Sequence, residues 1–317
     1  MAAALTSPGT MYDQVAANKR RSRLLIAGFV AFVSLVAVVF AYLVDGGPVG
    51  IAVAVVVAVA LSFGSYWSSD AIALRVSRAR PAPAEEYPRY HNIVEGLCIA
   101  SGLPKPRLYV VDDPAPNAFA TGRNPRHAAV AVTTGLLEKM NRIELEGVLA
   151  HELSHVRNYD ILLSTLAVTM VGVVAVLADL GIRLQWWGLG RTAHRDYDDQ
   201  RGGGGGPQAL LAVVGFLLLA LAPVVAQVMQ RTVSRRREIL ADVSGVEMTR
   251  YPPGLISALE KLRDDSTVVH AASHATAHLW IEQPSAQSEA EGRLSRINRM
   301  FDTHPSIEER IALLREL

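Results

Sequence analysis

Four long runs of apolar residues constrain the fold of this chain more than any other feature of its 317 residues. They cover residues 24–44, 49–67, 161–178 and 210–229. A helix needs about 20 apolar residues to cross the hydrocarbon core of a bilayer, and a chain that is 50% hydrophobic is too apolar for an ordinary soluble protein. The sequence therefore predicts a mainly α membrane protein with four hydrophobic helices in contact with the lipid bilayer.

The first two runs predict a transmembrane hairpin over 24–67, preceded by a mobile N-terminal tail over 1–23. A signal peptide is the competing interpretation, but the first run is too long for one, and a second run follows after a short turn at Asp45. Basic residues lie only at the outer ends of the pair, so the positive-inside rule places both ends in the cytoplasm. These residues are Lys19, Arg20, Arg21 and Arg23 before the pair and Arg75, Arg78 and Arg80 after it.

The last two runs predict a second membrane hairpin over 161–230. Its connection is a Gly-rich loop over 188–208, in which five glycines follow one another. Asp179 brings the third run close to the lower length limit for a span, which leaves a shallow or re-entrant hairpin as the alternative. With four spans, every segment outside the membrane except the two loops returns to the cytoplasmic side.

Charge and cysteine content exclude several kinds of protein. The formal net charge is +1, from 31 basic and 30 acidic residues, so the chain offers no surface suited to nucleic acid. Cys98 is the single cysteine, which excludes an intramolecular disulfide. Its apolar neighbours indicate a thiol in a hydrophobic core.

Residues 151–155 form an H-E-x-x-H pattern inside a helix predicted over 144–158, which leads toward the third apolar run. At about 100° per residue, His151 and His155 share one helical face and lie about 6 Å apart along the axis, so both rings can reach one cation. Glu152 can take the proton from a water whose pKa the metal has lowered. The alternative is a chance pair of histidines on a solvated face, but the small and apolar flanking residues favour a buried helix. The pattern predicts a catalytic site with one Zn2+ per chain.

A catalytic zinc needs a third protein ligand and one open position. Glu238 is the best candidate, because Asp242 follows it by about one helical turn and can accept the second ring N–H of His151. Glu247 and His304 are alternative ligands that lack such a partner. The competing interpretation is that Glu238 only pairs with the arginines before it on a solvated face, although the apolar residues after it favour a half-buried helix.

The segments outside the membrane predict one domain in two halves. The first half covers 75–160 and contains the helix of the zinc site, and the second covers 231–317 and carries the third ligand. Both halves adjoin apolar runs, which places the zinc site near the bilayer surface. Strands are predicted over 107–111 and 128–134, and helices over 234–249, 253–263 and 306–317.

Several short motifs together resemble the HtpX-type membrane zinc metalloproteases, which are relatives of the CAAX prenyl endopeptidases. They lie at residues 116–122, 129–135, 151–160, 237–242, 275–279 and 303–306. The resemblance runs from the first span to the C-terminus and implies a cytoplasmic α+β zincin-like catalytic domain with a small sheet. It implies a multi-pass protease of the bacterial cell (inner) membrane that cleaves unfolded, misfolded or damaged membrane proteins from the cytoplasmic side, in quality control and stress response. Other membrane proteases are the further partners that it suggests.

The expected reaction is hydrolysis of a peptide bond without a covalent intermediate, with Glu152 as the proton carrier. By resemblance, His304 is a catalytic candidate that stabilises the oxyanion, and Asn117 is a candidate for binding the substrate backbone; a structural role stays open for both. If the second strand edges the cleft, its main chain can pair with an extended substrate. The substrate-binding candidates on that strand are Ala128, Ala129, Val130, Ala131, Val132 and Thr133.

Two other functions stay open at this point. A prenyl-protein processing peptidase would need a large intramembrane chamber, for which four spans are too few. A non-catalytic membrane scaffold stabilised by zinc would have no use for Glu152.

Overall fold

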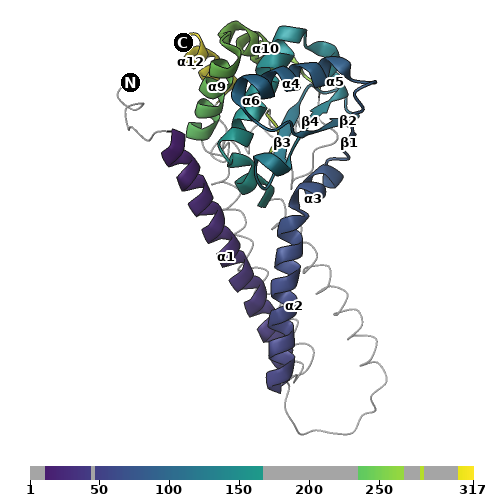
Figure 1. Cartoon of the computed structure of the whole chain (residues 1–317), viewed down its shortest axis with the longest axis vertical. Helices are drawn as coiled ribbons and strands as arrows, with labels where there is room; N and C mark the ends of the chain where they lie inside the picture. Colours follow the sequence, from purple (N-terminus) through teal and green to yellow (C-terminus); the bar gives the residue numbers. More distant parts are fainter. Residues whose placement is uncertain (1–10, 44–46, 167–234, 268–278, 282–305) are drawn as a thin grey trace, which may run out of the picture. The chain divides into compact units, whose positions relative to one another are not determined.

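The computed structural model describes residues 11–43, 47–166, 235–267, 279–281 and 306–317 (Figure 1). Of these, the residues up to Ser22 and those from Ser68 onward belong to one unit, and residues 23–67 belong to a second. The third apolar run beyond residue 166, the Gly-rich loop and the fourth run lie outside the described residues. The second membrane hairpin therefore stays a prediction.

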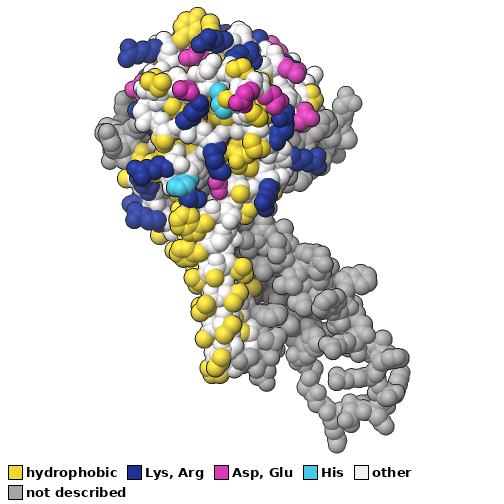
Figure 2. Space-filling model, turned by 45° about the vertical axis from the view of Figure 1, so that its right-hand side comes forward, with side chains coloured by type: hydrophobic (Ala, Val, Ile, Leu, Met, Phe, Trp, Pro, Cys, Tyr) yellow, Lys and Arg dark blue, Asp and Glu magenta, His cyan; other side chains and the backbone are white. Residues whose placement is uncertain are grey.

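The second unit contains the two apolar helices of the first predicted hairpin. Helix α1 (Met11–Leu43) continues into this unit, and α2 (Gly47–Trp67) lies wholly within it. The stretches Val15–Val38 and Gly47–Trp67 are long and apolar enough to cross a membrane. Large apolar side chains of α2 are exposed, among them Val49 at 76% and Val56 at 68%. Figure 2 shows a largely hydrophobic surface along these helices, which suits contact with lipid.

The start of α1 differs from the predicted mobile tail. Residues Met11–Ser22 are helical and belong to the first unit. Asn18 is only 4% exposed, and its side chain donates a hydrogen bond to the carbonyl of Asn158 at 3.0 Å. The tail prediction is wrong for this segment, because its polar side chains make a tertiary contact that the local sequence does not reveal.

A four-stranded mixed sheet forms one layer of the first unit. The strand order is β1-β2-β4-β3, with β2 parallel to β4, and with β1–β2 and β3–β4 antiparallel. All residues of β3 and β4 are buried. The strands are β1 (Arg80–Pro81), β2 (Arg107–Val111), β3 (Ala118–Gly122) and β4 (Ala128–Thr133).

Strand β4 lies inside the sheet, so the prediction that it edges a cleft is wrong. Its main chain pairs with β2 on one side and with β3 on the other, which leaves no free edge for a substrate. Strand order depends on pairing between distant segments, which the local alternation of residues does not encode. Among the described strands, β1 and β3 take the two edge positions. The correction applies to Ala128, Ala129, Val130, Ala131, Val132 and Thr133.

Helix α6 (Arg142–Arg157) is the central helix of the first unit. It packs against α9, α10, α4 and β3 (Figure 1), and most of its residues are buried. The described chain is thus mostly helical with a small mixed sheet. The other helices of this unit are α3 (Ser69–Val76), α4 (Pro88–Ser101), α5 (Thr134–Lys139), α9 (Arg235–Thr249), α10 (Pro252–Asp264) and α12 (Ile307–Leu314), and a short 3₁₀ helix covers Pro125–His127.

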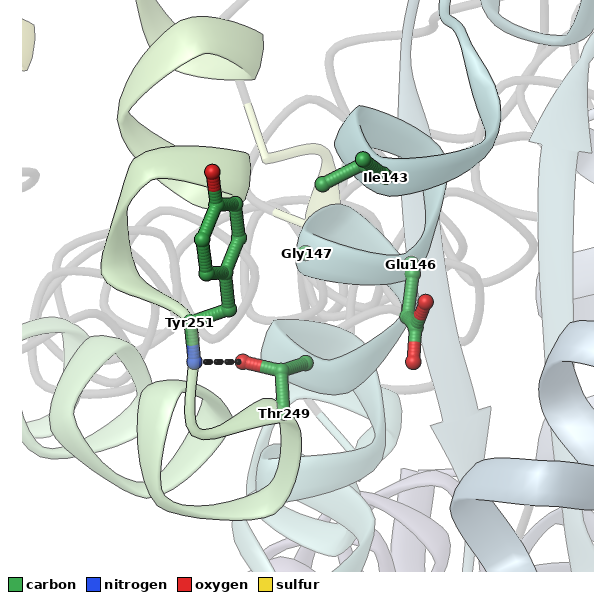
Figure 3. Close-up of a pocket in the computed structure, with 5 residues that line it drawn as sticks. All are labelled: Ile143, Glu146, Gly147, Thr249 and Tyr251. Atoms are coloured by element: carbon green, nitrogen blue, oxygen red, sulfur yellow. Dashed lines mark hydrogen bonds between the residues drawn. The ribbon is translucent and has the colours of Figure 1, made fainter.

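Two glycines let α6 approach its neighbours closely. A Cβ atom at Gly147 would lie 2.7 Å from the backbone nitrogen of Leu255 in α10, and one at Gly245 of α9 would lie 3.0 Å from the backbone nitrogen of His151. Both distances are too short for a side chain without a backbone shift. Beside the first contact lies a small cleft (Figure 3), lined by Ile143, Glu146, Gly147, Thr249 and Tyr251.

Cys98 lies in the hydrophobic core, as its neighbours in the sequence indicate. It is 5% exposed, and burial raises the pKa of its thiol to about 11. The thiol is therefore protonated at neutral pH, and the thiolate that a nucleophile needs is scarce.

Candidate metal centre

Helix α6 begins with a capping box. The side-chain oxygen of Asn141 accepts hydrogen bonds from the N–H groups of Ile143 at 2.9 Å and Glu144 at 3.0 Å. The Glu144 carboxylate in turn accepts a hydrogen bond from the N–H of Asn141 at 2.8 Å. These bonds satisfy N–H groups that the first turn of any helix leaves without a partner. The helix predicted around the H-E-x-x-H pattern is present, and the pattern lies in its C-terminal half.

His151, His155 and Glu238 bring their ligand atoms to one point. The two histidine Nε2 atoms are 3.3 Å apart, and the Glu238 carboxylate oxygens lie 3.6 Å from Nε2 of His151 and 3.7 Å from Nε2 of His155. Ligand atoms at a tetrahedral zinc are about 3.3 Å apart, given metal–nitrogen bonds of about 2.0–2.1 Å. The three side chains therefore fit three positions of a tetrahedral metal ion, and no fourth His, Cys, Asp or Glu among the described residues joins the group.

The orientation of His151 is fixed by Asp242 from α9 and Arg310 from α12. Nδ1–H of His151 donates to Asp242 at 2.8 Å, so in the neutral ring Nε2 is the nitrogen that offers a lone pair to a metal ion. Arg310 donates two hydrogen bonds to the same carboxylate, from Nε at 2.8 Å and from a terminal nitrogen at 2.6 Å. Asp242 thus takes the position that the sequence predicts for it.

His155 has its own carboxylate partner. Its Nδ1 lies 3.4 Å from Asp160, so Nδ1–H donates to Asp160 and Nε2 faces Glu238. Both histidines therefore have the pairing typical of metal ligands, in which the second ring nitrogen donates to an acceptor. Asp160 follows the helix, which ends at Arg157, so α6 does not continue directly into the third apolar run.

With both histidines neutral, the buried groups around the three candidate ligands carry an excess of negative charge. Four carboxylates and two guanidinium groups are nearly excluded from solvent, so two negative charges are in excess. A buried charge needs a partner, and the two positive charges can come from a divalent cation or from protonation of His151 and His155, whose pKa values are raised. The carboxylates are Glu152, Asp160, Glu238 and Asp242, and the guanidinium groups are Arg237 and Arg310.

Burial and neighbouring charges shift the pKa values of His151 and Glu152. Burial and the Arg310 charge lower the pKa of His151, but Asp242 and Glu238 outweigh them and raise it to about 9. Burial raises the pKa of Glu152 more than the neighbouring histidines lower it. A carboxylate whose pKa is raised is a better proton acceptor near neutral pH than an ordinary glutamate.

The other candidates from the sequence are Asn117, Glu247 and His304. Asn117 is fully buried, and its side-chain oxygen accepts a hydrogen bond from the N–H of Ala118 at 3.0 Å, so its contact with substrate stays a prediction. Glu247 is exposed and pairs with Arg157 at 3.5 Å. Within the described ranges, the group that can hold a metal consists of the two histidines and Glu238. His304 lies outside the described residues.

Sequence reasoning missed Arg310, although a signal for it exists. The terminal helix has apolar residues at Ile307, Ile311 and Leu314, and Arg310 interrupts that stripe. It is 2% exposed, and an arginine so deeply buried needs an acidic partner. The partner, Asp242, lies 68 residues earlier in the chain, so sequence alone does not identify it.

The chain is similar to known proteins over most of its length. A protein named Protease HtpX homolog from Caldanaerobacter subterraneus subsp. tengcongensis is 41% identical over 308 residues, covering 97% of this chain and 98% of that protein. A protein of the same name from Ligilactobacillus salivarius is 40% identical over 308 residues, covering 97% of this chain and 100% of that protein. Ste24p of S. mikatae superposes with a TM-score of 0.49 at 16% identity, over 95% of this chain and 66% of that one.

The family model described as Peptidase family M48 matches residues 84–317. This range contains all three ligands, Glu152 and the two acidic partners of the histidines. The chain therefore belongs to peptidase family M48 and is a metalloendopeptidase of the HtpX type.

Proposed function

We propose that this membrane metallopeptidase holds one zinc ion with His151, His155 and Glu238 and hydrolyses peptide bonds of misfolded or damaged membrane proteins at the cytoplasmic face. The observation that carries the proposal is the convergence of three ligand atoms within 4.8 Å of one another, with Glu152 next to them on the same helix. A structural zinc site would close the fourth position with another protein ligand. A carboxylate beside an open position is typical of a hydrolytic site.

When bound, the zinc ion supplies Lewis-acid chemistry, which makes a water acidic near neutral pH and polarises the carbonyl to be cleaved. Glu152 accepts the proton of that water and then donates it to the nitrogen of the leaving amine. Asp242 keeps His151 in the tautomer that binds metal, and Arg310 keeps Asp242 charged and in place. The chain thus supplies the metal ligands, the proton carrier and the groups that orient them.

The edge strand β3 is the segment that we propose to bind an extended substrate. The main chain of Ala118 is occupied, because its carbonyl accepts a hydrogen bond from the N–H of Ile281 at 3.0 Å. The N–H of Gly122 donates to the Thr165 hydroxyl at 3.0 Å. Ala120 lies between them and points its main-chain groups to the same side, because every second residue of a strand does so. Among the described residues no group pairs with the main chain of Ala120 on this side, so we propose that a substrate strand adds its hydrogen bonds there.

The membrane setting supports this class of substrate. Two described stretches are long and apolar enough to cross a bilayer. Basic residues flank the first pair of apolar runs at its outer ends, which favours a cytoplasmic position for the catalytic domain. Pairing through main-chain hydrogen bonds depends on an extended chain more than on its sequence, and this suits proteolysis of unfolded segments.

The variant Glu152→Gln tests the proposed function, with Glu146→Gln on the same helix as the matched control. Purified enzyme in lipid vesicles is mixed with an unfolded membrane protein, and both cleavage and zinc content are measured. We expect Glu152→Gln to keep its zinc and to lose cleavage by at least about a hundredfold, while the control cleaves normally. Unchanged cleavage by Glu152→Gln would exclude Glu152 as the proton carrier and the mechanism with it.

A further inference from the structure

The turn that follows α6 connects a metal ligand to the start of the chain. The helix ends at Arg157, and Tyr159 has a φ of 59°, which is a left-handed conformation that L residues rarely adopt. The next residue, Asp160, directs one carboxylate oxygen toward Nδ1 of His155 at 3.4 Å. The orientation of this histidine therefore depends on a turn with an unfavourable backbone conformation, which persists only where its surroundings hold it.

Asn18 from α1 holds both ends of this turn. Its side-chain nitrogen donates one hydrogen bond to the carbonyl of Asn158 at 3.0 Å and another to the second carboxylate oxygen of Asp160. Asn18 and Asp160 are 4% exposed, and Asn158 is fully buried. These bonds span the residue in the left-handed conformation, so they stabilise the turn as a unit.

Lys19 makes a second contact with the same turn. Its Nζ lies 4.1 Å from the centre of the Tyr159 ring, within the range of a cation–π interaction. Two successive residues of α1 therefore contact three successive residues of the turn. All of them belong to the first unit of the chain, although α1 continues from there into the first apolar run.

We propose that Asn18 is a positioning residue of the metal centre, which orients His155 through Asp160. An amide is suited to this role because it donates to the carboxylate without neutralising it, so Asp160 keeps its charge for the histidine. A lysine at this position would compete with His155 for that charge. The inference rests on the zinc centre proposed above and adds the segment before the first apolar run to the elements that support it.

A double-mutant cycle on zinc affinity tests the inference. The apparent zinc dissociation constant of full-length enzyme in detergent is measured by competition with a chromophoric chelator, for wild type, Asn18→Ala, Asp160→Ala and the double variant. The control is Asn92→Ala, an exposed asparagine on α4. Loss of an outer partner of a metal ligand weakens binding by about 10–100-fold. We expect at least about tenfold for Asp160→Ala and a smaller but measurable loss for Asn18→Ala.

The decisive result is the effect of Asn18→Ala when Asp160 is already absent. If Asn18 acts through Asp160, the substitution has no further effect in that background, because interacting residues are not additive. Cobalt-loaded Asn18→Ala should also show shifted visible absorption bands, which report the ligand geometry. Equal losses in both backgrounds, or unchanged affinity and an unchanged cobalt spectrum, would overturn the inference. Absence of zinc binding in wild type and in Asn92→Ala would instead show that the metal centre itself is wrong.

Discussion

The buried charged groups around the two halves of α6 are compensated in different ways. In the N-terminal half, the Glu144 carboxylate meets the Lys261 ammonium at 2.7 Å, the Ser257 hydroxyl at 2.7 Å and the N–H of Asn141 at 2.8 Å. One acidic group thus has one basic partner and enough donors. In the C-terminal half, four buried carboxylates face two guanidinium groups, and three ligand atoms converge on one point.

This difference separates a structural acidic residue from a metal site. Both halves contain buried glutamates, so burial of a carboxylate does not by itself indicate a ligand. Around the N-terminal half the buried carboxylate is matched by one basic group, whereas around the C-terminal half two negative charges are in excess when the histidines are neutral, as they are when they bind a metal. The same helix can therefore contribute packing at one end and chemistry at the other.

The largest effect on stability is expected at the buried ion pair of the C-terminal half. Arg310→Met leaves Asp242 buried without its guanidinium partner, which costs about 3–5 kcal/mol. Arg315→Met, directly after the same helix, is the control. The Arg315 side chain is 64% exposed and pairs with Glu260 at the surface, where such pairs contribute about 0–1 kcal/mol. Denaturant unfolding in detergent compares the two. Equal losses would show that the C-terminal half is no more sensitive than the surface.

The next effect concerns packing at the N-terminal half. Gly147→Ala would place a Cβ 2.7 Å from the backbone nitrogen of Leu255, and overpacking of this kind costs about 1–3 kcal/mol. Gly96→Ala is the matched control, since nothing lies within 4 Å of a Cβ there, and an alanine inside a helix stabilises by about 0.5–1 kcal/mol. The two melting temperatures should move in opposite directions. A stabilised Gly147→Ala would contradict the close approach of α6 and α10.

The smallest effect is expected for Glu144, the buried carboxylate that pairs with Lys261. Glu144→Gln weakens the capping box and the contact with Lys261, at a cost of about 1 kcal/mol. Zinc content and cleavage should not change, because Glu144 contacts none of the ligands. A loss of zinc in this variant would remove the distinction between the two halves.

Local patterns predict the group of residues that can hold a metal, because each pattern lies within one helix. The two histidines are one turn apart on α6, and Glu238 and Asp242 are one turn apart on α9, so helical geometry alone brings each pair to one face. The sequence does not predict how α6 and α9 meet. That depends on Gly245, whose missing side chain lets α9 approach the backbone of His151.

The features that sequence reasoning missed all depend on distant segments. Arg310 and Asn18 are polar residues in helices whose partners lie far along the chain. The interior place of β4 depends on which strands pair beside it. Local sequence indicated a mobile tail and an edge strand because neither a tertiary hydrogen bond nor a strand order leaves a periodic pattern.

The central claim is that His151, His155 and Glu238 hold one zinc ion, and metal analysis of two glutamate variants on α9 tests it most directly. Glu247 lies on the same helix but pairs with Arg157 at the surface. Purified wild type and Glu247→Gln should each contain one zinc per chain, and Glu238→Gln should retain only a small fraction of that. Full zinc content in Glu238→Gln, or its loss in Glu247→Gln, would contradict the claim.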